Sequence, residues 1–216
     1  MWWPAYIGVG SNIDDPGAQV LKAIDLLRAL KVNDVGAQPD AVARLVAGQP
    51  AAAQSAAVSN IASQRPTSAA AGGTAINTAA VQVVLISPLY GSKPLGSISQ
   101  PDFVNGVIGV LTQLDALTLL KALRSIESAL GRPDKHEKWG PRVIDLDLLV
   151  YARETRTGPE LTLPHPGIVN RNFVLYPLAD IAPDLDVPGL GRVAELKGQV
   201  APTGLWPLPP RAPAIA

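Results

Sequence analysis

Hydrophobic and polar positions follow strand-like and helix-like periods in turn along the first part of the chain. Residues 6–10 and 81–87 are short apolar runs of strand composition, which predicts two strands. Between them, apolar residues recur at helical spacing over residues 16–30. Asp15 is the expected N-cap of this helix and Pro16 its first residue. One apolar face of the helix is therefore expected to lie on a sheet.

The same alternation continues in the second half of the chain. The expected elements are a loop over 88–101, a strand over 103–112, a helix over 116–130 ended by Gly131, a strand over 143–151, a helix over 173–181 capped by Asn172, and a short strand over 184–187. From Pro202 onward the chain is Pro-rich and is expected to be extended or loose. This order predicts an α+β fold, a ferredoxin-like sandwich with a mostly antiparallel sheet and helices largely on one side.

The composition changes sharply in the stretch from residue 33 to residue 80. This stretch is dominated by Ala, is punctuated by Pro and Gly, and shows no clear period of either kind. We interpret it as a surface insertion or long flexible connection that carries no chemistry. The sequence thus predicts one domain over residues 1–190, interrupted by this insertion, and a Pro-rich tail over residues 191–216.

Charge and composition exclude several classes of protein. The formal net charge is zero, so no bulk electrostatic attraction to nucleic acid or to an acidic membrane surface is expected. The absence of Cys excludes a disulfide framework, a thiolate metal site and a cysteine nucleophile. The start lacks the basic region and apolar stretch of a signal peptide, and no apolar run is long enough for a spanning helix. We expect a cytoplasmic monomer that acts on small molecules.

Two carboxylates interrupt the strand expected over residues 143–151. Asp145 and Asp147 are alternate residues, so they share one face of that strand with their Cα atoms about 6.5–7 Å apart. Two ionised carboxylates at this spacing repel each other and are costly to bury. A divalent cation relieves both problems, and oxygen ligands suit Mg²⁺.

The loop before this strand decides between two interpretations of the acidic pair. Taken alone, Asp-x-Asp also fits an edge strand whose acidic face is solvated. The loop carries Arg132, Lys135, Lys138 and Arg142. Cations beside a carboxylate pair are what a site for polyphosphate and metal needs, so this context favours a phosphoryl-transfer site.

Seven segments, in order, resemble the 6-hydroxymethyl-7,8-dihydropterin pyrophosphokinase family. They lie at residues 6–12, 92–96, 100–105, 126–132, 138–149, 163–166 and 170–178. The most specific is Lys-Trp-Gly-Pro-Arg-Val-Ile-Asp-Leu-Asp-Leu-Leu, which contains the acidic pair. The similarity covers roughly residues 5–31 and 81–186.

The resemblance implies a ferredoxin-like fold and transfer of the pyrophosphoryl group of ATP to the pterin hydroxymethyl group. Asp145 and Asp147 would hold two Mg²⁺ ions, and Asp147 is the better candidate to help deprotonate the substrate hydroxyl. Arg132 and Arg142 would complete the catalytic set by clamping phosphates on mobile loops. Such a displacement rests on positioning and electrostatics, so it needs no protein nucleophile.

The remaining site residues implied by the resemblance fall into two groups. The ATP-binding group is Glu127, Lys135, Trp139, Leu148, Thr162, His165 and Arg171. The pterin-binding group is Gly10, Ser92, Lys93, Pro94, Leu95, Phe103, Asn105, Trp139, Asp145 and Phe173. A flat bicyclic ring needs aromatic faces and amide-type hydrogen bonding, which Phe103, Phe173 and Asn105 offer.

Two positions depart from the family pattern. Asp134 stands where the family often has a second basic residue, and Glu160 where some members have a basic contact to the nucleotide. Two other hypotheses therefore accompany the active enzyme: a binding module without turnover, and a different Mg²⁺-dependent phosphotransferase. The intact acidic pair argues against the first, and the expected pterin-side residues argue against the second.

Overall fold

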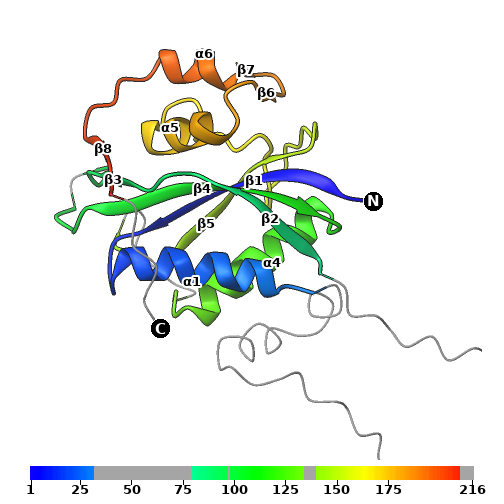
Figure 1. Ribbon diagram of the computed structural model, residues 1–216, viewed down its shortest axis with the longest axis horizontal. Coiled ribbons are helices and arrows are strands. Elements are labelled where there is room, and N and C mark those ends of the chain that lie inside the picture. Colours follow the sequence, from blue (N-terminus) through cyan, green and yellow to red (C-terminus); the bar gives the residue numbers. More distant parts are fainter. Residues whose placement is uncertain (32–78, 97, 134–139, 210–216) are drawn as a thin grey trace, which may run out of the picture.

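A single antiparallel sheet forms the centre of the molecule (Figure 1). The computed structural model describes residues 1–31, 79–96, 98–133 and 140–209. In sheet order the strands are β5 (Asp145–Tyr151), β1 (Trp3–Ser11), β4 (Phe103–Thr112), β3 (Tyr90–Ser92) and β8 (Leu205–Pro207), with β2 (Val81–Ile86) pairing the far end of β4. Each strand pair in this sheet is antiparallel, which confirms the predicted sheet type.

Helices cover both faces of the sheet (Figure 1). On one face, α1 (Pro16–Ala29) and α4 (Ala116–Ala129) pack with the sheet into one hydrophobic core. On the other face, α5 (Asn172–Ile181) and α6 (Val193–Gly198) form a second core, beside the hairpin β6 (Asp186–Val187) and β7 (Gly191–Arg192). The α+β class is confirmed, but the expectation of helices largely on one side is wrong because both sheet faces carry apolar side chains.

Local capping sets the ends of the first two long helices. The Asp15 carboxylate accepts a hydrogen bond from the backbone N–H of Ala18 at 3.2 Å, as predicted for the N-cap of α1. Asp115 caps α4 in the same way. Gly131 follows α4 with φ of +94°, a left-handed conformation that glycine adopts without strain. The start of α1 and the end of α4 were thus predicted from the sequence.

The predicted cap of α5 is wrong. Arg171 occupies the N-cap position and makes no capping hydrogen bond with its side chain. The Asn172 amide instead donates to the backbone carbonyls of Ala201 and Thr203, each at 3.0 Å. The side chain is taken by a tertiary contact because the C-terminal segment passes over the start of this helix.

Two short strands of the main sheet were not expected, and neither were strand β7 and helix α6. The predicted loop over 88–101 contains β3, and the predicted loose tail from Pro202 contains β8. These strands pair with each other in antiparallel register, with Gly91 opposite Trp206. Of the two expectations for the tail, extended or loose, residues 205–207 are extended, but their pairing with β3 was not predicted because a three-residue strand is too short to show a period. The main sheet thus extends beyond the domain end expected at residue 190.

The ends of the Ala-rich stretch meet at one place in the fold. The expectation for residues 33–80 falls outside the described residues except at its last two positions. Lys31 and Ala79 form an antiparallel bridge, and the backbone N–H of Ala80 donates to the Leu30 carbonyl at 2.9 Å. The chain therefore leaves the fold at the end of α1 and re-enters it directly beside that point.

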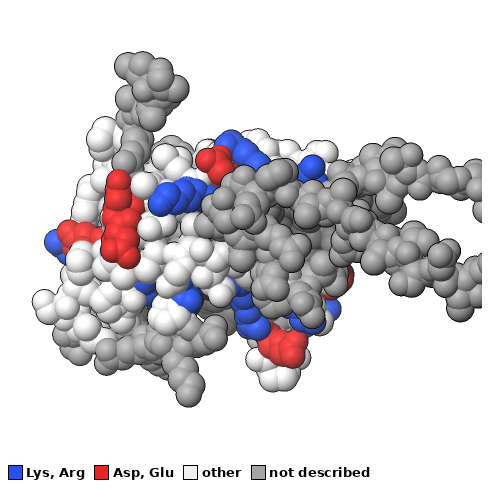
Figure 2. All heavy atoms as spheres, turned by 90° about the horizontal axis from the view of Figure 1, so that it is seen from below, with Lys and Arg blue, Asp and Glu red and all other residues white. Residues whose placement is uncertain are grey.

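The surface seen from below mixes charges of both signs. On the parts of this face that grey atoms do not cover, acidic and basic side chains are interspersed among uncharged ones (Figure 2). This pattern agrees with a formal net charge of zero. Among the described residues, no helix is both long enough and apolar enough to cross a bilayer.

Candidate active site

Two glycines of β1 lie opposite the two carboxylates of the acidic pair. In the β5–β1 ladder, Asp145 lies opposite Gly10 and Asp147 lies opposite Gly8. Opposite residues in an antiparallel ladder share a sheet face, so β1 places no side chain beside either carboxylate. Gly10 in turn pairs with Asn105 of β4, whose Oδ1 would lie 3.0 Å from a Cβ on Gly10. Asp145, Gly10 and Asn105 thus form an open row across three strands.

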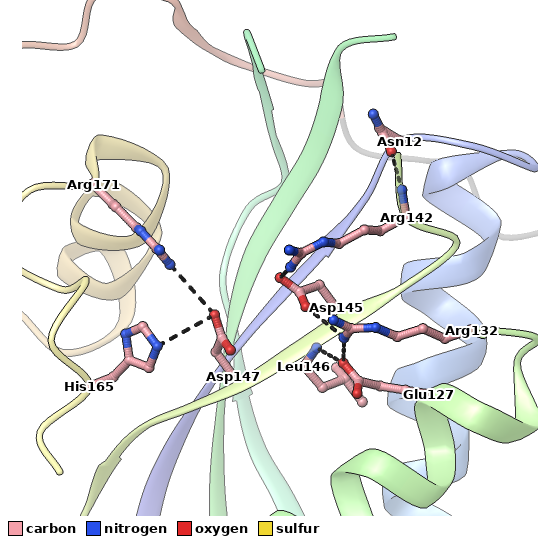
Figure 3. Close-up of polar contacts among 9 residues, drawn as sticks. All are labelled: Asn12, Glu127, Arg132, Arg142, Asp145, Leu146, Asp147, His165 and Arg171. Carbon is pink, nitrogen blue, oxygen red and sulfur yellow. Dashed lines mark hydrogen bonds and ion pairs between the residues drawn. The ribbon is translucent and has the colours of Figure 1, made fainter. Parts of the chain in front are cut away.

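Asp145 is held between two arginines (Figure 3). Its Oδ1 accepts from Arg132 Nη1 and its Oδ2 from Arg142 Nη1, both at 2.6 Å. The three side chains are largely buried. Charge-assisted hydrogen bonds of this length are strong. The two guanidinium groups therefore offset the negative charge of Asp145.

Glu127, in the last turn of α4, lies below this cluster. Its Oε1 accepts the backbone N–H of Leu146 at 2.6 Å and contacts Arg132 Nη1. Burial raises the pKa of Glu127 to about 7, although the Arg132 guanidinium and the Leu146 N–H both act in the opposite direction. Glu127 therefore joins α4, Arg132 and the start of β5, and it fixes where the guanidinium of Arg132 lies.

Asp147 has weaker partners on the opposite side (Figure 3). Its Oδ2 lies 3.6 Å from Arg171 Nη1 and 3.9 Å from His165 Nε2, both beyond hydrogen-bond distance. Burial raises the pKa of Asp147, and the negative charge of Asp145 raises it further. A cation beside these oxygens would relieve that cost, so the donor set fits a divalent metal ion.

His165 presents one nitrogen toward the acidic pair. Its Nδ1 accepts the backbone N–H of Gly167 at 3.0 Å, so in the neutral ring the proton is on Nε2, the nitrogen nearest Asp147. Burial lowers the pKa of His165 and the nearby Arg171 charge lowers it too, against the opposing effect of Asp147. A neutral imidazole with an N–H toward the site is able to donate to an anionic ligand.

Two hollows meet at the acidic pair. The first is lined by most of the residues expected to bind the pterin and by their neighbours: Gly8, Val9, Gly10, Ser92, Lys93, Leu95, Gln100, Phe103, Asn105, Gly106, Gly140, Arg142, Asp145, Asp147, Leu149, Arg171, Phe173 and Val174. In it, Asn105 Nδ2 donates to Ser92 Oγ at 2.9 Å, which orients the amide. The second is lined by Leu120, Arg124, Glu127, Ser128, Arg132, Pro133, Arg142, Asp145, Leu146 and Asp147. One hollow is aromatic and amide-lined, the other is basic, and both share the two carboxylates.

Most of the predicted site residues lie together in these hollows, but several do not. Leu148 is buried in the core on the α1 and α4 face, away from the acidic pair. Thr162 donates weakly to the Gly158 carbonyl and, like Pro94, does not line either hollow. His165 also lines neither hollow, although its Nε2 lies 3.9 Å from Asp147 Oδ2. The expectations for Lys135 and Trp139 fall outside the described residues.

Asn12 is a candidate site residue to which the sequence assigned no role. It is buried at the end of β1, where its Nδ2 donates to Gln100 Oε1 at 2.9 Å and to the Pro101 carbonyl at 3.0 Å. Its Oδ1 accepts the backbone N–H of Arg142 at 2.7 Å (Figure 3). Asn12 thus fastens the loop of the first hollow to the segment that carries Arg142. Two signals in the sequence point to it: its place in the Gly-Ser-Asn turn that follows a strand, and its place in segment 6–12, which resembles the family.

Comparisons with known protein sequences identify a family. The family model described as 7,8-dihydro-6-hydroxymethylpterin-pyrophosphokinase matches residues 56–183, more than half of the chain. A Pseudomonas aeruginosa 2-amino-4-hydroxy-6-hydroxymethyldihydropteridine pyrophosphokinase is 45% identical over 128 residues, 59% of this chain and 78% of that protein. The Methylorubrum extorquens protein of the same name is 39% identical over 201 residues, 93% of this chain and 96% of its own length.

A solved structure agrees at the level of the fold. The HPPK-DHPS protein of Plasmodium falciparum, crystallised with pteroate, superposes with a TM-score of 0.56 at 12% identity. The superposition covers 92% of this chain and 42% of that longer chain. At this identity the likeness concerns the fold alone, which is the ferredoxin-like one that the sequence predicted. On the family model and the sequence relatives, the chain belongs to the 7,8-dihydro-6-hydroxymethylpterin-pyrophosphokinase family.

Proposed function

We propose that this protein transfers the pyrophosphoryl group of ATP to 6-hydroxymethyl-7,8-dihydropterin, giving AMP and the pterin diphosphate for folate synthesis. Membership of the family and the names of its relatives support this reaction. The observation that carries it is the position of Asp145 and Asp147, which line both an aromatic hollow and a basic one. A reaction between a flat heterocycle and a polyphosphate needs such a junction.

The aromatic hollow has the size and chemistry for the pterin. Phe103 and Phe173 line it and offer ring faces, while the Asn105 amide offers directional hydrogen bonds. Asn105 and Asp145 are two strands apart in one row, so their Cα atoms are about 10 Å apart. That separation accommodates a bicyclic ring whose hydroxymethyl group reaches the acidic pair.

The basic hollow is proposed to take the triphosphate of ATP. Arg132 and Arg142 neutralise Asp145 in the structure, and we expect them to turn toward phosphate oxygens when ATP binds. Asp145 and Asp147 would then hold two Mg²⁺ ions, which would offset the negative charge that develops on the phosphates. Glu127 and the Leu146 N–H keep the start of β5 in place during this exchange.

The reacting groups meet at Asp147. The hydroxymethyl oxygen attacks the β-phosphorus, a new O–P bond forms, and the bond from that phosphorus to the α–β bridging oxygen breaks to release AMP. Asp147 accepts the hydroxyl proton, while Arg171 and the Nε2–H of His165 donate to phosphate oxygens on the opposite side. Asn12 holds the two loops in register around this point.

The nucleotide product separates the candidate reactions. Purified protein is incubated with Mg²⁺, ATP and the reduced pterin, and the nucleotides are resolved by chromatography, with a control lacking pterin. The proposal requires AMP in amounts equal to the pterin diphosphate. Formation of ADP would indicate a different phosphotransferase, and pterin binding without any nucleotide product would indicate a binding module. Both hollows are formed by one chain, so we also propose a monomer, which light scattering tests.

A further inference from the structure

The C-terminal segment crosses the molecule from one wall of the aromatic hollow to the other. We call this hollow, which is proposed to bind the pterin, the pterin-side hollow. In Figure 1 it leaves α6, passes the start of α5 and enters the sheet as β8 beside β3. We define residues 200–208 as the strap. One wall of the hollow is the start of α5, which carries Phe173, and the other is formed by β3 and the residues after it, including Ser92 and Lys93.

Hydrogen bonds attach the strap to the α5 wall. The Asn172 amide, between two residues that line the hollow, donates to the carbonyls of Ala201 and Thr203 at 3.0 Å. One turn later, the Tyr176 hydroxyl donates to the Val200 carbonyl at 3.2 Å. The strap therefore holds the first two turns of α5 through two half-buried polar side chains.

A short ladder attaches the strap to the β3 wall. The backbone N–H of Leu208 donates to the Leu89 carbonyl at 2.8 Å, and the N–H of Lys93 donates to the Gly204 carbonyl at 2.9 Å. Between these two bonds, β8 runs antiparallel to β3. Without the strap, β3 would be a three-residue edge strand whose backbone pairs with the first residues of β4. Its remaining link to α5 would be through side chains, such as the Tyr90 hydroxyl, which donates to Asp180 at 2.6 Å.

Trp206 packs against a surface of β3 that only glycine can provide. It lies opposite Gly91, and a Cβ on Gly91 would lie 2.2 Å from its indole Cε2. Lys93 Nζ lies 5.6 Å from the centre of the same ring. Ser92 alternates with Gly91 and so faces the other side of β3, where its hydroxyl orients Asn105. Trp206 thus supports the strand from behind without lining the hollow.

We propose that the strap, through Trp206, sets the separation of the two walls and so positions Ser92 and Asn105 for the pterin. Trp206 is a positioning residue, because it acts through β3 and does not touch the acidic pair. The inference rests on the proposed pyrophosphokinase reaction. Its distinctive consequence is that loss of the strap should weaken binding of the pterin but not of ATP. The pterin-side hollow depends on the strap, whereas the basic hollow is lined by α4, β5 and the segments flanking them.

The experiment measures KM for each substrate in Trp206→Ala, with Trp3→Ala as the matched control. Trp3 is an indole in the same sheet, 41% exposed and about 23 Å along β1 from Gly10. We expect Trp206→Ala to raise the KM for the reduced pterin about tenfold, with the KM for ATP unchanged. Trp206→Phe should keep a pterin KM close to that of the wild type, and Trp3→Ala should leave both KM values unchanged.

A double-mutant cycle tests whether the contact with Gly91 carries the effect. Gly91→Ala should raise the pterin KM as Trp206→Ala does, because the new methyl group displaces the indole. Combining both changes should add nothing to either alone, since the same contact is lost. These variants also serve if Trp206→Ala fails to fold, because Trp206→Phe and Gly91→Ala are smaller changes.

Failure of the proposed function and failure of the proposed role of the strap would give different results. A wild-type protein that forms no AMP overturns the proposed function itself. With an active wild type, equal rises in both KM values, a pterin KM like that of Trp3→Ala, or additive effects of the two changes would each overturn the role of the strap.

Discussion

The change Glu127→Gln isolates the cost of burying a carboxyl group beneath the acidic pair. Glu127 is buried, and its pKa is raised to about 7 from an ordinary value of 4.5. Burial is the dominant cause, and it outweighs the opposing effects of Arg132 and the Leu146 N–H. A raised pKa means that the folded protein holds this proton more tightly than the unfolded chain does. The group therefore makes the stability depend on pH.

The sign and size of the effect follow from these two pKa values. Below about pH 4.5 the carboxyl group is protonated in both states, and its contribution is fully retained. From there to about pH 7 the unfolded chain ionises first, so the free energy of unfolding falls as pH rises. The total fall is about 3 kcal/mol, since one pH unit between the two values corresponds to about 1.4 kcal/mol. Gln keeps the size and the acceptor for Leu146 but does not titrate, so its variant should lack this fall.

Urea unfolding at about pH 5, 6, 7 and 8 measures the difference between variant and wild type. We expect Glu127→Gln to gain stability relative to the wild type as pH rises, with most of the gain between pH 5 and pH 7. Glu195→Gln, an exposed change of the same kind on α6, controls for the loss of one negative charge. A difference that stays constant across this range would refute the reasoning. It would mean that Glu127 is ionised in the folded protein throughout, with its two donors outweighing burial.

Three further changes probe other parts of the molecule. Asp147→Ala should lower turnover about a thousandfold while circular dichroism stays that of the wild type, and substantial residual turnover would contradict the assigned role. Asn12→Ala should lower kcat/KM for both substrates, about a hundredfold, because it releases both loops. An effect on one substrate alone would contradict that link. Tyr151→Phe removes a buried donor to the Leu114 carbonyl at 2.7 Å and should lower the free energy of unfolding by about 1–2 kcal/mol, without changing either KM. An unchanged urea midpoint would show that this hydrogen bond contributes nothing net.

Features set by neighbouring residues could be predicted from the sequence. Asp15 caps α1 because its carboxylate needs only to reach a backbone N–H three residues ahead. Gly131 follows the end of α4 because it adopts a positive φ without a clash. Asp145 and Asp147 share a face because side chains in a strand alternate, whatever the rest of the chain does.

Predictions from the local sequence pattern failed where a residue or strand interacts with a distant part of the chain. Asn172 is of a residue type that often caps helices. Its side-chain amide instead donates to backbone carbonyls about thirty residues further along the chain. The strands β3 and β8 are too short for a period to appear, and they exist because each pairs with a distant segment. No spacing in the sequence indicates that pairing.

The sequence by itself determined the three longest helices (α1, α4 and α5), the long strands and the shared direction of the two carboxylates, because each depends on contacts between near neighbours. Only the tertiary structure decided what faces that pair. Strand register placed Gly10 and Asn105 in the same row as Asp145, although they lie far apart in the chain. Packing of α5 on the sheet brought Arg171 to Asp147 on the side away from Arg132. Such placements follow from which distant segments pair and pack together, and a local pattern of apolar and polar residues leaves that choice open.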